Sequence, residues 1–208
     1  YKGNVKGYIQ NPQAELPKKP NGKLNVSGII GQGEMCVIRD EGTGDPQTGF
    51  CEIVSGEIAE DICAYFVQSE QIPTVCSLGV LVDTDLSCRA AGGILIQLLP
   101  YAAEETIAAI ERNLPRMSNI SSLYDRGMSN EEIAAFVLDG IEYDIFDAFS
   151  AEYRCDCSSE RILSALTSFS PKELDDTFRE DKTIEVCCRF CDRKYYFTRD
   201  EIEKYSKK

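Results

Sequence analysis

Histidine is absent from this chain of 208 residues. Because histidine is the usual general base and proton carrier at neutral pH, its absence excludes catalysis by a serine–histidine or cysteine–histidine pair. It also removes the commonest nitrogen ligand for metal ions. Any metal site must therefore rely on other side chains.

Long apolar runs and an excess of basic charge are also missing. The longest apolar stretch is the short run Ile94–Leu99, and no charged-then-apolar leader opens the chain. The sequence therefore predicts no membrane span and no signal peptide, and we expect a cytoplasmic protein. The formal net charge is −13, with most of the acidic excess in residues 1–150. Since nucleic-acid binding depends on basic residues that neutralise phosphates, this balance argues against DNA, RNA or an anionic membrane surface as a partner.

The residues that are present predict an α+β protein with three parts. Residues 1–101 are expected to form a sheet-rich core domain, residues 102–150 a helical linker, and residues 151–208 a small four-cysteine zinc module. In the first part, glycine and proline clusters separate short apolar or alternating runs, which is typical of strands and turns. The expected strands are Val5–Gln10, Leu24–Ile29, Met35–Arg39, Phe50–Val54, Val75–Asp83 and Ile94–Leu99. Because the chain opens directly in strand-like sequence, we expect the first strands of the core domain to be missing.

Helices are predicted by apolar residues at helical spacing and by capping boxes, in which a serine or threonine precedes a glutamate by three positions. One helix interrupts the strands at Ile58–Phe66, and a helical pattern covers residues 102–149. Capping boxes begin at Ser129, Ser170 and Thr198. Because the linker helices are too few to close a core of their own, we expect them to dock elsewhere and to be only conditionally stable.

Four of the ten cysteines have the spacing of a metal site. Cys155 and Cys157 form a CxC pair, and Cys188 and Cys191 form a CxxC pair after thirty intervening residues. In an extended strand, alternate side chains share a face, so the first pair can hold one ion. The second pair lies between two strand-like runs and has the spacing of a zinc knuckle. Four thiolates without histidine favour one tetrahedral zinc ion, with iron as the lesser alternative.

The other six cysteines lack ligand spacing. Because free cysteine is among the most buried residue types, five are interpreted as core or incidental thiols. These five are Cys36, Cys51, Cys63, Cys76 and Cys88. Cys187 adjoins a ligand in an extended arm and is expected to face the opposite way, as a bystander able to compete during oxidation. A thioredoxin-type dithiol would open a helix, whereas the residues after Cys191 are strand-like, so that interpretation fails.

Together with the upstream sequence, these cysteines resemble the heat shock protein 33 family of redox-regulated molecular chaperones. The resemblance covers the whole chain. The family's core domain is similar to GYIQNPQAELP at 7–17, RDEGTGDPQTGFCEIVSGEIAEDICAYFVQSEQIPT at 39–74 and RAAGGILIQLLP at 89–100. The family's four zinc ligands match Cys155, Cys157, Cys188 and Cys191. The departures are the missing N-terminal part of the core domain and the additional Cys187.

The resemblance implies a stress-response holdase, not an enzyme, that prevents unfolding client proteins from aggregating. It is idle while reduced and zinc-bound, and it becomes active when oxidation pairs Cys155 with Cys157 and Cys188 with Cys191 and ejects the single zinc ion. The zinc module then unfolds and the linker loses its docking. The apolar residues that become exposed include Ile133, Phe136 and Val137. The resemblance also implies a homodimer when oxidised and no ATP hydrolysis, and no GxxxxGK[ST] phosphate loop is present.

Two other functions fit the same cysteines. One is a structural zinc module on an acidic protein-interaction domain without redox switching, and the other is a thiol oxidoreductase. The interaction module would be indifferent to peroxide, whereas the oxidoreductase would turn over disulfide substrates. The chaperone would gain holdase activity on oxidation.

Overall fold

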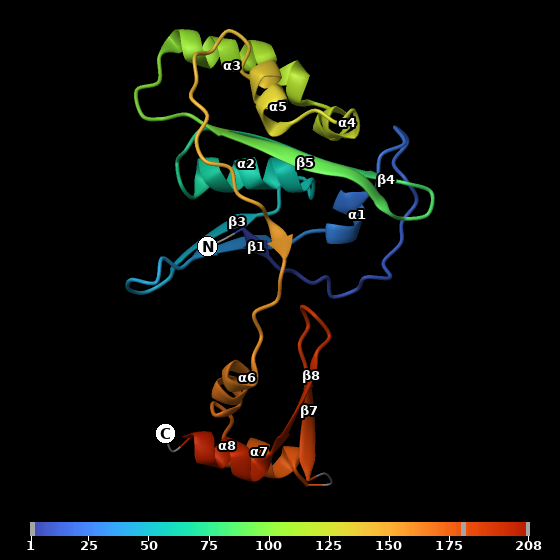
Figure 1. The fold of residues 1–208 in the computed structure, drawn as a ribbon, viewed down its shortest axis with the longest axis vertical. Coiled ribbons are helices and arrows are strands. Elements are labelled where there is room, and N and C mark those ends of the chain that lie inside the picture. Colours follow the sequence, from blue (N-terminus) through green and yellow to red (C-terminus); the bar gives the residue numbers. More distant parts are fainter. Residues whose placement is uncertain (1–2, 180–181, 207–208) are drawn as a thin grey trace. The chain divides into compact units, whose positions relative to one another are not determined.

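The structure, a computed structural model, describes residues 3–179 and 182–206 (Figure 1). These residues fall into two compact units. The larger unit is Gln13–Phe146, and the smaller unit joins residues 3–12 to residues 147–179 and 182–206. Both units mix helices and strands, which confirms the predicted fold class. Among the described helices, none is long and apolar enough to cross a membrane.

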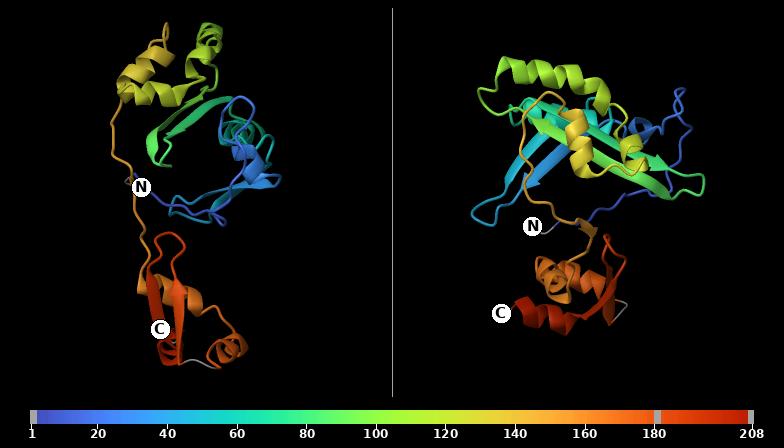
Figure 2. Two further views of the ribbon diagram at one scale, coloured as in Figure 1. Left: turned by 90° about the vertical axis from the view of Figure 1, so that its right-hand side faces the viewer. Right: turned by 45° about the horizontal axis from the view of Figure 1, so that its top comes forward.

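The larger unit contains two antiparallel hairpins, one of β2 and β3 and one of β4 and β5. Helix α2 lies on one face of the β4–β5 hairpin, and α3, α4 and α5 lie on the other (Figures 1 and 2). The strands are β2 Glu34–Arg39, β3 Gln47–Glu52, β4 Thr74–Val82 and β5 Cys88–Gln97. The helices are α1 Val26–Ile30, α2 Ile58–Gln68, α3 Glu104–Met117, α4 Ile120–Asp125 and α5 Asn130–Val137.

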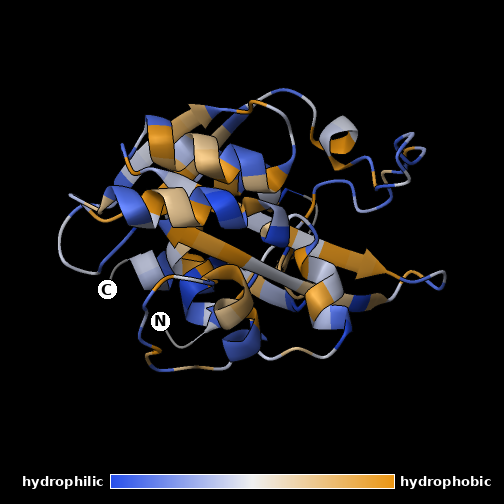
Figure 3. Cartoon of the chain, turned by 90° about the horizontal axis from the view of Figure 1, so that it is seen from above, coloured by the Kyte–Doolittle hydropathy of each residue, from blue (hydrophilic) through white to orange (hydrophobic). Residues whose placement is uncertain are grey.

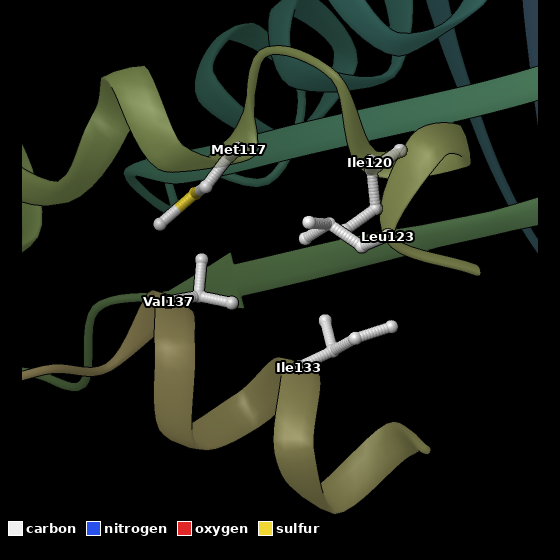
Figure 4. Close-up of a cluster of buried hydrophobic side chains, with 5 residues drawn as sticks. All are labelled: Met117, Ile120, Leu123, Ile133 and Val137. Atoms are coloured by element: carbon white, nitrogen blue, oxygen red, sulfur yellow. The ribbon is translucent and has the colours of Figure 1, made fainter. Parts of the chain in front are cut away.

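The main apolar core of the larger unit lies between the β4–β5 hairpin and α3–α5. Ile94 and Ile96 share one face of β5 because they are two residues apart, and both pack against the buried side chains of the helices. Those side chains are Met117, Ile120, Leu123, Ile133 and Val137 (Figure 4). Seen from above, the helices carry both hydrophobic and hydrophilic stretches (Figure 3). The helices between residues 104 and 137 therefore dock on the hairpin, and each fully buried aliphatic side chain contributes about 1.5–3 kcal/mol.

Two opposed glycines allow α4 to approach the hairpin closely. Gly79 and Gly92 are cross-strand partners in β4 and β5. A Cβ atom at Gly79 would lie 2.8 Å from the Cβ of Ser121, and one at Gly92 would lie 2.0 Å from the ring of Tyr124. Any larger residue at either position would push α4 away from the sheet.

The smaller unit combines a short parallel pair, a hairpin and three helices. Strand β1 pairs with β6 in parallel, and β7 pairs with β8 in antiparallel orientation. The strands are β1 Asn4–Val5, β6 Glu152–Tyr153, β7 Thr183–Cys187 and β8 Lys194–Thr198. The helices are α6 Ser159–Leu166, α7 Pro171–Thr177 and α8 Arg199–Ser206. Among the described residues of this unit, the buried apolar core consists of Leu166, Leu174, Phe197 and Ile202.

Several predicted elements are confirmed and others are wrong. The capping boxes at Ser129, Ser170 and Thr198 are formed as predicted. The strand predicted at Leu24–Ile29 is instead helix α1, because the side-chain oxygen of Asn25 accepts a hydrogen bond from the Gly28 amide (3.1 Å) and caps a helical turn.

Other boundaries also differ from the prediction. The strand predicted at Val5–Gln10 pairs only as far as Val5, since β6 offers it two partners. The predicted helical pattern over residues 102–149 divides into three helices and ends at Val137.

Candidate metal centre

The four cysteines with ligand spacing come from two segments of the smaller unit. Cys155 and Cys157 lie between β6 and α6, and Cys188 and Cys191 lie in the loop that joins β7 to β8. That loop is at the end of the hairpin remote from α7 and α8 (Figures 1 and 2). The structure thus brings together two pairs that are separated by thirty residues.

Local hydrogen bonds fix both segments. The Cys188 amide donates to the carbonyl of Arg193 (2.9 Å), and the Asp192 amide donates to the carbonyl of Cys188 (2.8 Å). Asp192 has a positive φ of 56°, which closes the tight turn between the strands. On the other segment, the hydroxyl of Ser158 accepts from the Arg161 amide (3.2 Å) and starts α6 directly after the CxC pair.

The four sulfur atoms form one compact group. The Sγ atoms of Cys155 and Cys188 are 3.6 Å apart, those of Cys157 and Cys191 are 3.5 Å apart, and all four lie within 4.8 Å of one another. A tetrahedral ion with Zn–S bonds of about 2.3 Å requires sulfur atoms about 3.8 Å apart. The group therefore fits a single ion with four sulfur ligands.

The thiols in this group have unequal proton affinities. The Tyr195 hydroxyl, 3.1 Å from the Cys157 sulfur, is the main reason why the pKa of Cys157 falls to about 7. A backbone hydrogen bond from Arg193 lowers the pKa of Cys191, but the neighbouring thiols, Cys157 first among them, outweigh it and raise that pKa to about 12. Four thiolates at this spacing repel one another, so a central cation is what allows all of them to be ionised together.

Charged side chains surround the CxC segment. Asp156, between the two cysteines of this pair, contacts Lys6 and Arg161. The Lys6 ammonium, and then the Arg161 guanidinium, lower the pKa of Asp156 to about 2. Asp156 is therefore a carboxylate at every pH at which the cysteines ionise.

The remaining cysteines lie outside this group. Cys187 is exposed at the end of β7, and its sulfur is 4.0 Å from the carbonyl oxygen of Cys188. Of the five cysteines interpreted as core or incidental thiols, Cys51 is buried and Cys63 and Cys76 are half-buried. Cys36 and Cys88 are exposed. Within the described residues, only the four spaced cysteines form a cluster able to hold an ion.

Comparison with known proteins decides the family. The family model described as Hsp33 protein matches residues 1–198. The chain belongs to the Hsp33 family. This Hsp33 chain is 42% identical over 202 residues to the 33 kDa chaperonin of Agathobacter rectalis, a match that covers 97% of this chain and 70% of the relative. It is 45% identical over 202 residues to the 33 kDa chaperonin of Clostridioides difficile, covering 97% and 69%.

A solved structure supports the same family assignment. The crystal structure of the 33 kDa chaperonin (heat shock protein 33 homolog) of Thermotoga maritima matches this Hsp33 chain with a TM-score of 0.82 and 37% identity. The match covers 99% of this chain and 70% of that one. The family resemblance of the sequence is thereby confirmed, and this Hsp33 chain is a chaperone.

Proposed function

We propose that this Hsp33 chain is a cytoplasmic holdase whose activity is controlled by oxidation of a four-cysteine zinc site. In the reduced state one zinc ion is held by Cys155, Cys157, Cys188 and Cys191, and the chaperone is idle. The compact sulfur group, with all four atoms within 4.8 Å, is the observation that carries this proposal. When bound, a zinc ion supplies the positive charge that stabilises four thiolates and a cross-link between their two segments.

The smaller unit needs such a cross-link because its apolar core is small. Its helices α6, α7 and α8 have only 7 or 8 residues, and isolated helices below about 12–15 residues are marginal in water. Structural zinc contributes an apparent folding free energy of about 10–16 kcal/mol in zinc-finger peptides. Loss of the ion therefore removes a main support of the unit, which then unfolds.

Oxidation of the four thiolates releases the zinc ion. Four thiolates lose four electrons and form two S–S bonds, while two molecules of hydrogen peroxide take up those electrons with four protons and yield four molecules of water. Cys191, which is exposed, gives peroxide access to the group. The disulfides formed are Cys155–Cys157 and Cys188–Cys191, and neither can hold the ion.

Chaperone activity follows from the apolar surface that the change uncovers. Ile133 and Val137 are buried in α5, whereas Phe136 on the same helix is 39% exposed. On this proposal residues 102–150 act as a linker that loosens when the zinc-binding unit unfolds, and these side chains then bind unfolding client proteins. The oxidised chains form a homodimer, and no ATP is consumed.

The central experiment follows light scattering from an aggregating client protein, with zinc release measured in parallel. Peroxide-treated protein should suppress aggregation and release one zinc ion per chain, and reduced protein should do neither. The Cys157→Ser variant should lose peroxide control, while Cys36→Ser, an exposed cysteine of the larger unit, should behave as the parent chain does. Equal suppression by both forms, or zinc retained after full oxidation, would contradict the proposal.

Peptide mapping tests the disulfide pairing. The shortest sulfur contacts join the two segments, from Cys155 to Cys188 and from Cys157 to Cys191, so the rival pairing is geometrically close. Trypsin cleaves after arginine and lysine and yields the peptides 155–161, 183–189 and 190–193. The proposed pairing leaves 155–161 with an internal disulfide and links 183–189 to 190–193. Covalent attachment of 155–161 to either of the other two peptides would refute the proposed pairing, and attachment to both would indicate the rival pairing.

A further inference from the structure

Residues 3–8 run beside the CxC segment, although they are about 150 positions away in sequence. In the parallel β1–β6 pair, the Glu152 amide donates to the Gly3 carbonyl (2.8 Å) and the Arg154 amide donates to the Val5 carbonyl (3.0 Å). This pairing fixes the register of the two strands, β1 and β6, just before Cys155. It therefore delivers the next residues of the N-terminal segment, Lys6 to Tyr8, to the candidate metal centre.

One side chain of this segment, Lys6, contacts residues of both cysteine segments. Lys6 forms an ion pair with Asp156, which lies between Cys155 and Cys157, and its ammonium is 5.2 Å from the ring centre of Phe190. Phe190 lies between Cys188 and Cys191. A single lysine thus touches the middle residue of the CxC pair and a middle residue of the CxxC pair.

Tyr8 completes the contact with the CxxC loop. Its ring meets that of Phe190 edge to face, with centres 5.7 Å apart and planes at 80°. The Arg189 guanidinium lies 5.7 Å from the centre of the Tyr8 ring. Both variable residues of the CxxC pair therefore contact Tyr8.

Tyr153 joins the backbone of the N-terminal segment to the backbone of the CxxC loop. The Tyr153 hydroxyl lies 2.9 Å from the carbonyl oxygen of Gly7 and forms a hydrogen bond with the carbonyl oxygen of Phe190. Tyr153 belongs to β6, two residues before the first cysteine. The N-terminal segment, the CxC segment and the CxxC loop are thus connected by hydrogen bonds that involve no sulfur atom.

We propose that Lys6 and Tyr8 are positioning residues of the metal centre. They hold the CxxC loop against the CxC segment at the spacing that a single ion requires, and so reduce the cost of ordering the ligands when the ion binds. Binding linkage is reciprocal, so the ion in turn holds the surface on which residues 3–8 pack. Loss of the ion therefore frees this segment together with the cysteine loops. The proposal rests on the zinc site of the proposed function.

Zinc release from the reduced chain to an excess of chelator tests the positioning role. Since an aromatic pair of this kind contributes modestly, Tyr8→Ser should accelerate release by about 2- to 10-fold. Tyr8→Phe keeps the ring and should release zinc at the parent rate. The matched control is Tyr101→Ser, at a fully exposed tyrosine of the larger unit, which should change nothing. Parent-like release from Tyr8→Ser, or equal acceleration by Tyr8→Phe, would overturn the proposal.

A fluorescence experiment tests the release of the segment. The chain has no tryptophan, so the Tyr8→Trp variant carries a single reporter beside Phe190, and Tyr101→Trp is its control. Removal of zinc from reduced protein should shift the emission of Tyr8→Trp to the red and leave that of Tyr101→Trp unchanged. Zinc content measured beforehand separates two failures. Reduced protein without zinc refutes the proposed function itself, whereas bound zinc with no shift on its removal refutes only the role of residues 3–8.

Discussion

Ile202→Ala should weaken zinc binding without touching a cysteine. Ile202 lies in α8 and is 1% exposed, in the apolar core of the smaller unit. Truncating a buried isoleucine to alanine costs 2–5 kcal/mol in typical cores, and about 3 kcal/mol is expected here because the small core has few neighbours that can rearrange to fill the space.

The size of the change in zinc affinity follows from the linkage between folding and zinc binding. If the smaller unit is mostly unfolded without its ion, the lost folding free energy appears in full as lost zinc affinity. Each 1.4 kcal/mol corresponds to a factor of ten, so about 3 kcal/mol lowers the apparent affinity about 100-fold. The zinc-bound form should still fold, because the ion contributes more than the substitution removes.

A chelator competition titration of the reduced protein measures this change. Ile133→Ala is the matched control, since it removes the same atoms from a side chain that is 2% exposed in the core of the larger unit. It should destabilise the larger unit and leave zinc affinity unaltered. The reasoning is refuted if Ile202→Ala keeps the parent affinity, or if Ile133→Ala lowers it equally.

Three further predictions concern single side chains. Cys187→Ser should leave zinc affinity intact because Cys187 lies outside the sulfur group, whereas Cys188→Ser should abolish tight binding. If both variants lost affinity equally in a chelator titration, the assignment of Cys188 rather than Cys187 as the ligand would be wrong. The Arg89 hydrogen bond lowers the pKa of Asp125, so this pair stabilises the fold above the unfolded pKa of about 4 and loses that effect as the pH falls through the lower folded value. Asp125→Asn should therefore increase hydrogen exchange in β5 at pH 7, and the difference from the parent chain should shrink as the pH falls below about 4. A difference that does not shrink would contradict this. Ser129→Ala removes the α5 cap and should cost about 1 kcal/mol, seen as faster exchange of the first α5 amides; unchanged exchange would mean that the cap is redundant.

Local sequence signals predicted the elements that depend on neighbouring residues. The capping boxes at Ser129, Ser170 and Thr198 each involve a side chain and a backbone amide only three positions apart, so the sequence alone contains both partners. The hairpin around the CxxC pair follows from two strand-like arms and a short turn. By contrast, five apolar or small residues at Val26–Ile30 fit a strand or a helix equally well, and the Asn25 side chain decides for the helix.

Elements and contacts that depend on distant residues could not be predicted from the sequence alone. A six-residue strand at Val5–Gln10 could be predicted from β propensity, but its length is set by β6, which offers a partner for Asn4 and Val5 alone. The CxC and CxxC spacing predicted which cysteines come together. Nothing in the local pattern around Lys6 or Tyr8 indicated that these residues contact the segments that carry the same cysteines, because the contacts join positions about 150 to 180 residues apart.

The discontinuous smaller unit has a consequence for synthesis of the chain. Among the described residues, β1 pairs only with β6, so this pairing cannot form until β6 emerges from the ribosome, and the contact of Tyr8 with Phe190 forms later still. At about 5–20 residues per second, β1 waits roughly 7–30 s for its partner strand, whereas the segment Gln13–Phe146 is already complete and free to fold. On the proposed function, the zinc site therefore assembles only after Gln13–Phe146 has been made, and each new chain passes through a period in which Cys155 and Cys157 are present without Cys188 and Cys191.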